Sequence, residues 1–431
     1  MGAGLAGSEC ALQLAKRGHS VVLYEMRPLA MTPAHKTGMC AELVCSNSLG
    51  SLTEPSAPAQ LKWEMTRLES KILEIAHLHR VPAGQSLSVD RDLFSKEITE
   101  EIKKHPLIRL EHKIIESLDS VPRPTVIATG PLTHENLASS IKDHFEGDFL
   151  YFYDAIAPVI DADSIDMEVC FKASRYDKGG ADYINCPMSK EQYYNLVEEI
   201  SKAEMVRPKD FETTPYFESC LPVEVMVERG PKTLSFGPCK PKGLRDPKTG
   251  KEAYAVVQLR QENKYATAFN MVGFQTKMTY PEQKRVFRMI PGLEKAEFLK
   301  LGSLHRNLFI NSPKLLTTTL SSKKDPLLFF AGQMTGVEGY FESTSTGMLV
   351  AIFLDALLAD KKIAPLPSET ALGALLNALN EEKENFQPTN INWGLFPPLL
   401  GVSKQDKKAR LAERACAAFE NSCLNPSGKR D

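Results

Sequence analysis

Two cysteines stand in surroundings that could support covalent chemistry. Cys45 lies within the polar run 41–48, and Cys220 lies between the aromatic pair Tyr216 and Phe217 and the segment 221–224. A thiolate with a lowered pKa can attack a polarised carbon–carbon double bond. A single cysteine is more often a small buried hydrophobic residue, and we assign the other cysteines to that class. We predict Cys45 and Cys220 as the catalytic candidates.

Glycines at the start of the chain are spaced to bind a pyrophosphate. Gly2, Gly4 and Gly7 form the pattern G-x-G-x-x-G. In this pattern the first glycine permits a tight turn, the second lets the backbone approach the phosphates, and the third lets the helix pack closely. The N–H groups at the start of the following helix then point at the anion. The pattern alone is weak, so its surroundings must support it.

The segment after these glycines has the layout of a dinucleotide-binding unit. Apolar residues recur at helical spacing over residues 5–17, and residues 20–24 read as a β-strand. Glu25 ends that strand 21 residues after Gly4, where an acidic side chain can bind a ribose hydroxyl. The predicted cofactor contacts here are Gly2, Ala3, Gly4, Leu5, Ala6, Gly7, Glu25, Met26 and Arg27.

Two later strands end in glycine and indicate a flavin. Residues 124–130 end in Ala-Thr-Gly, which in flavoproteins of the two-dinucleotide-binding type marks where the chain passes the flavin. Residues 327–332 form a second such strand, and a glycine-rich turn and a helix over residues 343–358 follow it. This arrangement suits the ribityl and pyrophosphate groups of FAD, although an unrelated strand–helix turn looks similar. The further predicted contacts are Gly130, Gly332, Gln333, Gly336, Val337 and Tyr340.

Cys40 and Cys45 offer an alternative function. Their C-x4-C spacing resembles the redox disulfide of glutathione-reductase-type flavoenzymes, which would make the chain an FAD/dithiol oxidoreductase. Those enzymes carry a second nucleotide-binding domain with its own glycine motif. No such motif is visible in residues 131–320.

These elements predict an α/β fold: a Rossmann-like FAD-binding domain of the glutathione-reductase type, with an inserted α+β domain. We expect the first part of the FAD-binding domain at residues 1–130, the inserted substrate domain at 131–320, and the second part with C-terminal helices at 321–431. Short strands are predicted in the insert at residues 223–227, 254–259 and 268–274.

The composition and the motifs that are lacking indicate where the protein works and which sites it does not need. The chain has 431 residues, a formal net charge of −2 and nine scattered cysteines. No apolar run reaches about 18 residues and no signal peptide is visible, so we expect a cytoplasmic protein with reduced thiols and no membrane partner. Neither C-x-x-C nor H-E-x-x-H occurs, which gives a zinc site little support.

One local segment is basic. Residues 240–251 carry five cations and one acid among proline and glycine turn residues. A solvated hairpin tip would have the same composition. Because the whole chain is not basic, contact with a nucleic acid would need a local patch of this kind, and Lys240, Lys242 and Arg245 are its candidates.

Longer motifs resemble the folate- and FAD-dependent tRNA (uracil-5-)-methyltransferases of bacteria, and the resemblance covers nearly the whole chain. A more distant similarity, through the turn Ala-Gly-Gln at residues 331–333, is to the flavoenzyme that modifies wobble uridines. The motifs that carry the main resemblance are residues 2–9, 24–28, 32–35, 41–49, 81–84, 174–179, 182–188, 236–238, 258–261, 305–307 and 331–340.

The resemblance implies that the chain converts the T-loop uridine of tRNA to ribothymidine. Methylenetetrahydrofolate would donate the carbon, reduced FAD would carry and reduce it, and NAD(P)H would restore the flavin through transient contact. A cysteine would add to C6 of the uridine and make C5 nucleophilic. Since that uridine is stacked in folded tRNA, it must be extruded to react.

The resemblance also implies roles for individual residues. Cys220 matches the nucleophile, and Cys45 matches the acid/base or nucleophile partner on the flavin side. His305, Arg306 and Tyr340 become expected neighbours of folate and flavin, although His305 could equally be structural. The basic segment 240–251 would hold tRNA phosphates.

Two features depart from the family pattern. Family members carry several apolar residues before the glycine motif, whereas here Met1 stands where the last of them belongs. We therefore expect the first strand of the sheet to be missing through a start-site error, and an extended chain to hold FAD more tightly. Cys40 stands where the family has another residue, so its spacing with Cys45 is expected to be accidental.

Overall fold

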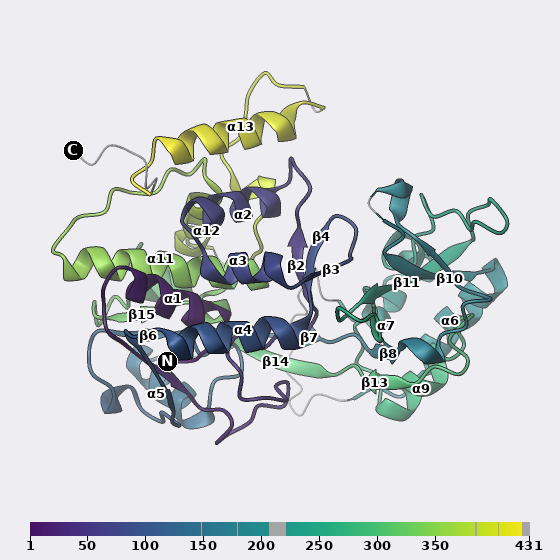
Figure 1. Ribbon diagram of the computed structural model, residues 1–431, viewed down its shortest axis with the longest axis horizontal. Helices are drawn as coiled ribbons and strands as arrows, with labels where there is room; N and C mark the ends of the chain where they lie inside the picture. Colours follow the sequence, from purple (N-terminus) through teal and green to yellow (C-terminus); the bar gives the residue numbers. More distant parts are fainter. Residues whose placement is uncertain (148, 179, 207–220, 384–385, 404, 425–431) are drawn as a thin grey trace.

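The structure is a computed structural model that describes residues 1–147, 149–178, 180–206, 221–383, 386–403 and 405–424. Figure 1 shows two lobes side by side. The larger lobe contains the first and the last helix of the chain, and the smaller lobe contains the middle of the sequence. Each lobe has its own hydrophobic core, and the core of the smaller lobe draws only on residues 160–298.

Parallel strand pairs form the centre of the larger lobe. β1 (Val21–Glu25) pairs with β5 (Ile108–His112), and β6 (Thr125–Ile127) pairs with β15 (Leu328–Phe330). The second pairing places a late strand beside an early one. Between β6 and β15 the chain therefore leaves this lobe and returns to the same sheet region, as expected for a domain interrupted by an insertion.

The first two residues join the two strand pairs. The Met1 amino group donates to the Val126 carbonyl at 2.7 Å, and the Met1 carbonyl accepts from the Ala128 N–H at 2.9 Å. The Gly2 N–H donates to the Tyr24 carbonyl at 2.8 Å. Met1 and Gly2 thus bond to β6 and its extension on one side and to β1 on the other.

Two helices cross closely above these strands. α1 (Leu5–Lys16) packs on α11 (Tyr340–Leu358), and Gly347 permits the contact, since a Cβ there would lie 2.1 Å from the Ala6 carbonyl oxygen. Gly7 faces the start of the chain instead, where a Cβ would lie 1.8 Å from the Gly2 carbonyl oxygen. By its length and composition α11 could cross a membrane. About two thirds of it is buried inside the lobe, however, as is typical of a core helix.

Shorter elements complete the larger lobe. Side chains of Ser56, Ser70 and Asp90 cap the helices α2, α3 and α4 by accepting from backbone N–H groups of the first turn. An antiparallel sheet has the order β2 (Ser48–Ser51), β4 (Ser86–Val89), β3 (Arg80–Val81). The remaining helices are α2 (Ala57–Arg67), α3 (Lys71–Leu78), α4 (Arg91–Lys104), α5 (Glu135–Phe145), α10 (Ser312–Leu315), α12 (Ala371–Asn380) and α13 (Lys407–Glu420).

An antiparallel six-stranded sheet forms the smaller lobe (Figure 1). Helices α6 (Lys190–Lys202), α7 (Val223–Glu228), α8 (Thr233–Phe236) and α9 (Tyr280–Phe287) accompany it. Its strands, in spatial order, are β13 (Phe298–Lys300), β8 (Val159–Asp161), β12 (Ala268–Met271), β11 (Ala255–Gln261), β10 (Tyr183–Met188) and β9 (Phe171–Ala173).

One predicted strand in this lobe is wrong. Residues 223–227 form α7, not a strand. Their valines suggested a strand, but Pro222 precedes the first helical residue, and Val223 and Val227 are both buried one helical turn apart. Helical spacing of the buried residues outweighed the strand preference of valine.

A two-stranded ribbon connects the lobes. β7 (Leu150–Ala155) pairs with the antiparallel β14 (Leu304–Phe309), and Figure 1 shows β14 running between the lobes. The chain thus enters and leaves the smaller lobe through adjacent strands.

Candidate functional site

The glycine loop forms the floor of a cleft in the larger lobe. Gly2 has φ +88°, which suits glycine, and Gly4 is the N-cap residue of α1. Within the described chain no side chain caps this helix, although its first residues are buried. A Cβ at Gly4 would have no neighbour within 4 Å. Open space before a buried, uncapped helix N-terminus fits a pyrophosphate.

Glu25 joins this loop to the residues that follow β1. Its carboxylate accepts from the Ala3 N–H at 2.8 Å, and from the N–H and Nε of Arg27 at 3.0 and 2.8 Å. Burial alone would raise the pKa of Glu25, but its bonds with Arg27 hold that pKa below its usual value. Glu25 is therefore an ionised, fixed acceptor beside the cleft.

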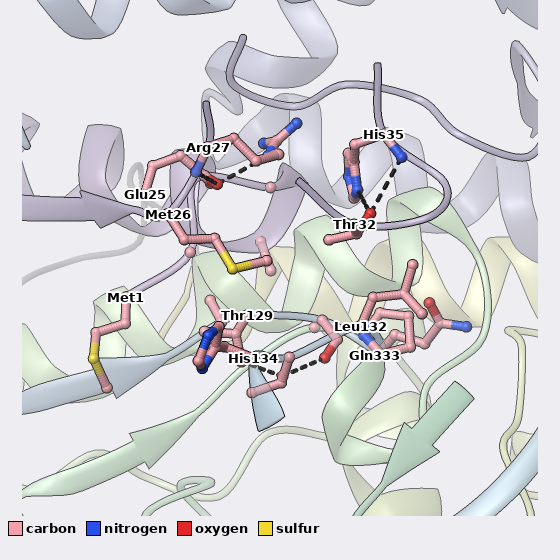
Figure 2. A pocket seen from close by; sticks show the side chains of 18 of the residues that line it. Met1, Glu25, Met26, Arg27, Thr32, His35, Thr129, Leu132, His134 and Gln333 are labelled. Carbon is pink, nitrogen blue, oxygen red and sulfur yellow. Dashed lines mark hydrogen bonds and ion pairs between the residues drawn. The ribbon is translucent and has the colours of Figure 1, made fainter. Parts of the chain in front are cut away.

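Figure 2 shows the two walls of this cleft, which we call the cofactor cavity. Glu25, Met26 and Arg27 lie on one wall, and Thr129 and His134 lie across from them. The Nδ1 atom of His134 is buried and has no hydrogen-bond partner among the described residues. A buried polar atom that faces a cleft without a partner fits a site that a polar ligand completes.

The predicted contacts from the second half of the chain divide into two groups. Gln333 lines the cofactor cavity, as do Gly130, Gly332 and Tyr340. Gly336 and Val337 are not part of its described lining. A Cβ at Gly336 would lie 2.6 Å from the Phe386 ring, and Val337 is fully buried. Among the predicted contacts from the first half of the chain, Ala3 and Gly7 are also outside the described lining, and they support the glycine loop on the side away from the cavity.

A second cavity continues from the first, and we call it the Cys45 cavity. It is lined by Cys45 and Ser46 from the loop before β2, by Lys62 from α2, and by the start of α11. Lining residues shared by the two cavities are Val44, Pro131, Leu132, Gln333, Tyr340 and Ser343. Cys45 lines only the second cavity, directly after the shared residue Val44, and therefore lies next to the junction of the two cavities.

Cys40 lies elsewhere. Its side chain is fully buried, outside the lining of both cavities as far as the structure describes it, and its N–H donates to the Thr99 hydroxyl at 2.8 Å. Burial raises the pKa of the Cys40 thiol to about 11. Cys40 is thus a protonated core thiol, which gives the dithiol alternative no support.

Tyr340 holds the backbone of the Cys45 loop. Its hydroxyl oxygen accepts from the N–H groups of Cys45 and Ser46 at 2.9 and 3.3 Å. Burial raises the pKa of Tyr340 well above its usual value, so the phenol remains neutral. Tyr340 therefore reaches both cavities and orients the loop that carries Cys45.

Sequence reasoning missed two buried charges in the Cys45 cavity. The ammonium group of Lys62 donates to the Ser51 and Pro58 carbonyls at 3.2 and 3.3 Å, and burial lowers its pKa to about 8. Glu342 accepts from the Ile391 N–H at 3.1 Å, and burial raises its pKa. In the sequence, the only signal for this pair was that a lysine falls on the side of α2 that carries the buried residues.

Cys220 lies outside the described residues. His305 and Arg306 belong to β14, and their backbones face Asp154 and Tyr153 of β7, while their side chains lie outside the described part.

The basic segment is accessible. Lys240, Lys242 and Arg245 are exposed in the turns that follow α8. The Arg175 guanidinium donates to the carbonyls of Lys242 and Lys240 at 2.5 and 3.0 Å, which fixes the turn. The lysine side chains therefore project from an ordered backbone.

Comparison with known proteins places this geometry in a family. The family model of GIDA, "Glucose inhibited division protein A", matches residues 1–362. A relative from Bdellovibrio bacteriovorus, "Methylenetetrahydrofolate--tRNA-(uracil-5-)-methyltransferase TrmFO", is 62% identical over 420 residues, which cover 97% of this chain and 95% of the relative. A relative of the same name from Aquifex aeolicus is 53% identical over 424 residues, with coverage of 97% and 95%.

Solved structures share the fold. GidA of Aquifex aeolicus matches with a TM-score of 0.66 in its form II crystal, at 14% identity, over 98% of this chain and 73% of that one. The form I crystal gives a TM-score of 0.67 at 14% identity, over 99% and 76%. The predicted α/β fold is confirmed.

Proposed function

Because the chain belongs to the family of methylenetetrahydrofolate–tRNA-(uracil-5-)-methyltransferases, we propose that it methylates C5 of the T-loop uridine in tRNA to ribothymidine. Methylenetetrahydrofolate is the one-carbon donor. The structural observation that supports the proposal best is the place of Cys45, which lines the second cavity next to its junction with the cofactor cavity.

The cofactor cavity offers the hydrogen-bond donors and the open space that FAD needs. The start of α1 holds the pyrophosphate, Glu25 and Arg27 bind near the ribose, and His134 supplies an unused polar atom. When bound, reduced FAD would supply the two electrons that reduce a methylene to a methyl group. NADH or NADPH restores the reduced cofactor by transient contact.

The two cysteines divide the remaining chemistry. The Cys220 thiolate forms a bond to C6 of the extruded uridine, and the electron pair of the C5–C6 double bond makes C5 nucleophilic. C5 then bonds to the one-carbon unit, and C5 loses its proton as the bond between that carbon and its carrier breaks. A hydride supplied by the reduced cofactor would add to the resulting methylene and complete the methyl group, and the sulfur–C6 bond breaks to restore the thiolate and the C5–C6 double bond. Cys45 acts beside the flavin as acid/base or nucleophile partner. Tyr340 keeps its proton and positions the Cys45 loop.

The smaller lobe binds the tRNA. The exposed Lys240, Lys242 and Arg245 contact phosphates. His305 and Arg306 stay expected neighbours of folate and flavin. We place the enzyme in the cytoplasm with its tRNA, and keep the domain limits at residues 130 and 320 as part of this proposal.

Ribothymidine formation by Cys220→Ser tests the nucleophile. We expect the variant to retain FAD, measured by its absorbance, and to form no ribothymidine in unmodified tRNA. Turnover like that of the wild type would contradict the role. Normal activity in Cys40→Ala would independently reject the dithiol alternative.

A further inference from the structure

Two cations hold the carbonyl groups of the Cys45 loop. Arg91, the first residue of α4, donates through Nη1 to the Leu43 carbonyl at 2.9 Å and through Nη2 to the Cys45 carbonyl at 3.5 Å. Lys300, in β13 of the smaller lobe, donates to the Val44 carbonyl at 2.8 Å. Three successive carbonyl groups are therefore bound by side chains from two lobes.

Arg91 is itself fixed from the smaller lobe. Glu262, directly after β11, accepts from Nε of Arg91 at 2.6 Å and from Nη2 at 3.0 Å. Both side chains are largely buried. Burial opposes the charge on Arg91, but Glu262 outweighs it and raises the pKa of the guanidinium. A two-point arginine–carboxylate pair of this kind fixes orientation as well as distance.

Neighbouring contacts tie the same two segments together. The Asn47 amide donates to the Gln261 and Glu262 carbonyls at 2.8 and 3.3 Å, and its oxygen accepts from Nε of Arg260 at 3.1 Å. Asp90, which caps α4, accepts from the Lys264 N–H at 2.9 Å. The end of β11 thus contacts the loop directly at Asn47, after the cysteine, and reaches the carbonyls of Leu43 and Cys45 through Arg91.

We propose that Arg91, Glu262 and Lys300 form an interlobe clamp that positions Cys45. They are positioning residues, because they hold the backbone of the loop, and the inference rests on the proposed role of Cys45. The clamp makes the catalytic geometry of the larger lobe depend on the seating of the smaller lobe.

The clamp also sets the charge around Cys45. Arg91, Arg260 and Lys300 all lie close enough to interact electrostatically with the Cys45 thiolate, while Glu262 and Tyr340 face the same loop. Burial lowers the pKa of Lys300 to about 8. Loss of a clamp cation should therefore change the reactivity of the thiol as well as its position.

The test compares Arg91→Met, Arg91→Lys and Glu262→Gln as FAD-loaded enzymes. We measure kcat and KM with tRNA, and the rate of Cys45 carboxamidomethylation by iodoacetamide from pH 6 to pH 9 by peptide mass spectrometry. For Arg91→Met we expect kcat to fall about 10- to 100-fold, with KM for tRNA changed by no more than about twofold. The pH profile of alkylation in Arg91→Met should move to higher pH. Arg91→Lys should recover part of the lost kcat and part of the shift in the profile. Glu262→Gln should give a kcat and a profile between those of the wild type and those of Arg91→Met.

Arg123 provides a matched control within the larger lobe. It pairs with Asp325 through Nε at 2.7 Å and donates through Nη1 to two backbone carbonyls, but it lies in neither the clamp nor the described lining of the cofactor and Cys45 cavities. Arg123→Met should leave kcat and the Cys45 profile unchanged. Wild-type kcat and alkylation in Arg91→Met would overturn the clamp, as would equal losses in Arg123→Met. If Arg91→Met does not fold, Glu262→Gln decides by the same two readouts.

If Cys45 has no catalytic role, Arg91→Met will change the alkylation profile and leave kcat intact. That result would reject the proposed role of Cys45 while retaining the contact between the clamp and its loop.

Discussion

The glycine loop and the Cys45 loop both line the proposed active site, but the side chains that fix them come from different distances along the chain. The side chain that bonds the glycine loop comes from Glu25, within the first 27 residues, and Arg27 fixes it there, although backbone bonds also join residues 1–3 to residues 41, 126 and 128. The Cys45 loop depends on Arg91, more than 40 residues later, and on residues beyond 260. A local motif can therefore be recognised from spacing, whereas a loop fixed by distant side chains cannot.

The largest expected effect separates two glycines of the same motif. Gly7→Ala places a Cβ 1.8 Å from the Gly2 carbonyl oxygen, so we expect a loss of several kcal/mol of unfolding free energy, about 3 or more, and no bound FAD. Gly4→Ala meets no atom within 4 Å, so the apoprotein should keep its stability and lose only FAD affinity. Thermal unfolding and FAD titration measure the two effects.

Equal stability losses in the two variants would break this part of the comparison, since they would show that Gly4 also has a packing role. Equal FAD affinity in Gly4→Ala and the wild type would show that the open space before α1 does not receive the pyrophosphate.

A smaller effect is expected at the Cys45 loop. Tyr340→Phe removes the oxygen that accepts from the Cys45 and Ser46 N–H groups and leaves both donors without it. We expect about 1–3 kcal/mol lower stability and a roughly tenfold lower kcat, with FAD still bound. Steady-state kinetics with tRNA and the FAD absorbance check this outcome. Loss of FAD with unchanged kcat per bound flavin would instead assign Tyr340 to the cofactor alone.

The smallest effect concerns pH at the glycine loop. The folded-state pKa of Glu25 lies below its usual value because of Arg27, so its stabilisation is present above pH 4.5 and is lost as the pH falls through the folded pKa. Glu25→Gln should cost about 1–2 kcal/mol at pH 7 and weaken the fall in stability below pH 4.5. Urea unfolding at pH 7 and pH 4 measures the difference. An unchanged acid dependence would place the sensitive carboxylate elsewhere.

The sequence predicted the fold class and the family, and most of the predicted cofactor contacts line the cofactor cavity, because these features depend on local spacing. β1 and β6 with its glycine were found in this way, and the fold and family are confirmed. The strand expected at residues 223–227 was wrong because short valine-rich runs fit either element. His134 escaped notice because nothing in its local pattern shows that it is buried and faces the cavity.

The Cys45 cavity could be predicted only in part. Cys45 itself stood out by its motif, but Lys62 and Arg91 look like ordinary helical cations in the sequence. Their roles arise when residues 43–46, 260–264 and 300 meet in space. The roles of Cys220, His305 and Arg306 stay predictions, as do the domain limits at residues 130 and 320.

The most direct test follows labelled carbon from methylenetetrahydrofolate into tRNA. The FAD-loaded wild type, Cys45→Ala and Cys40→Ala would be compared in one assay, with the label identified as ribothymidine. We predict transfer by the wild type and by Cys40→Ala, and a loss of about a thousandfold or more in Cys45→Ala with FAD retained. Transfer by Cys45→Ala at the wild-type rate would contradict the account.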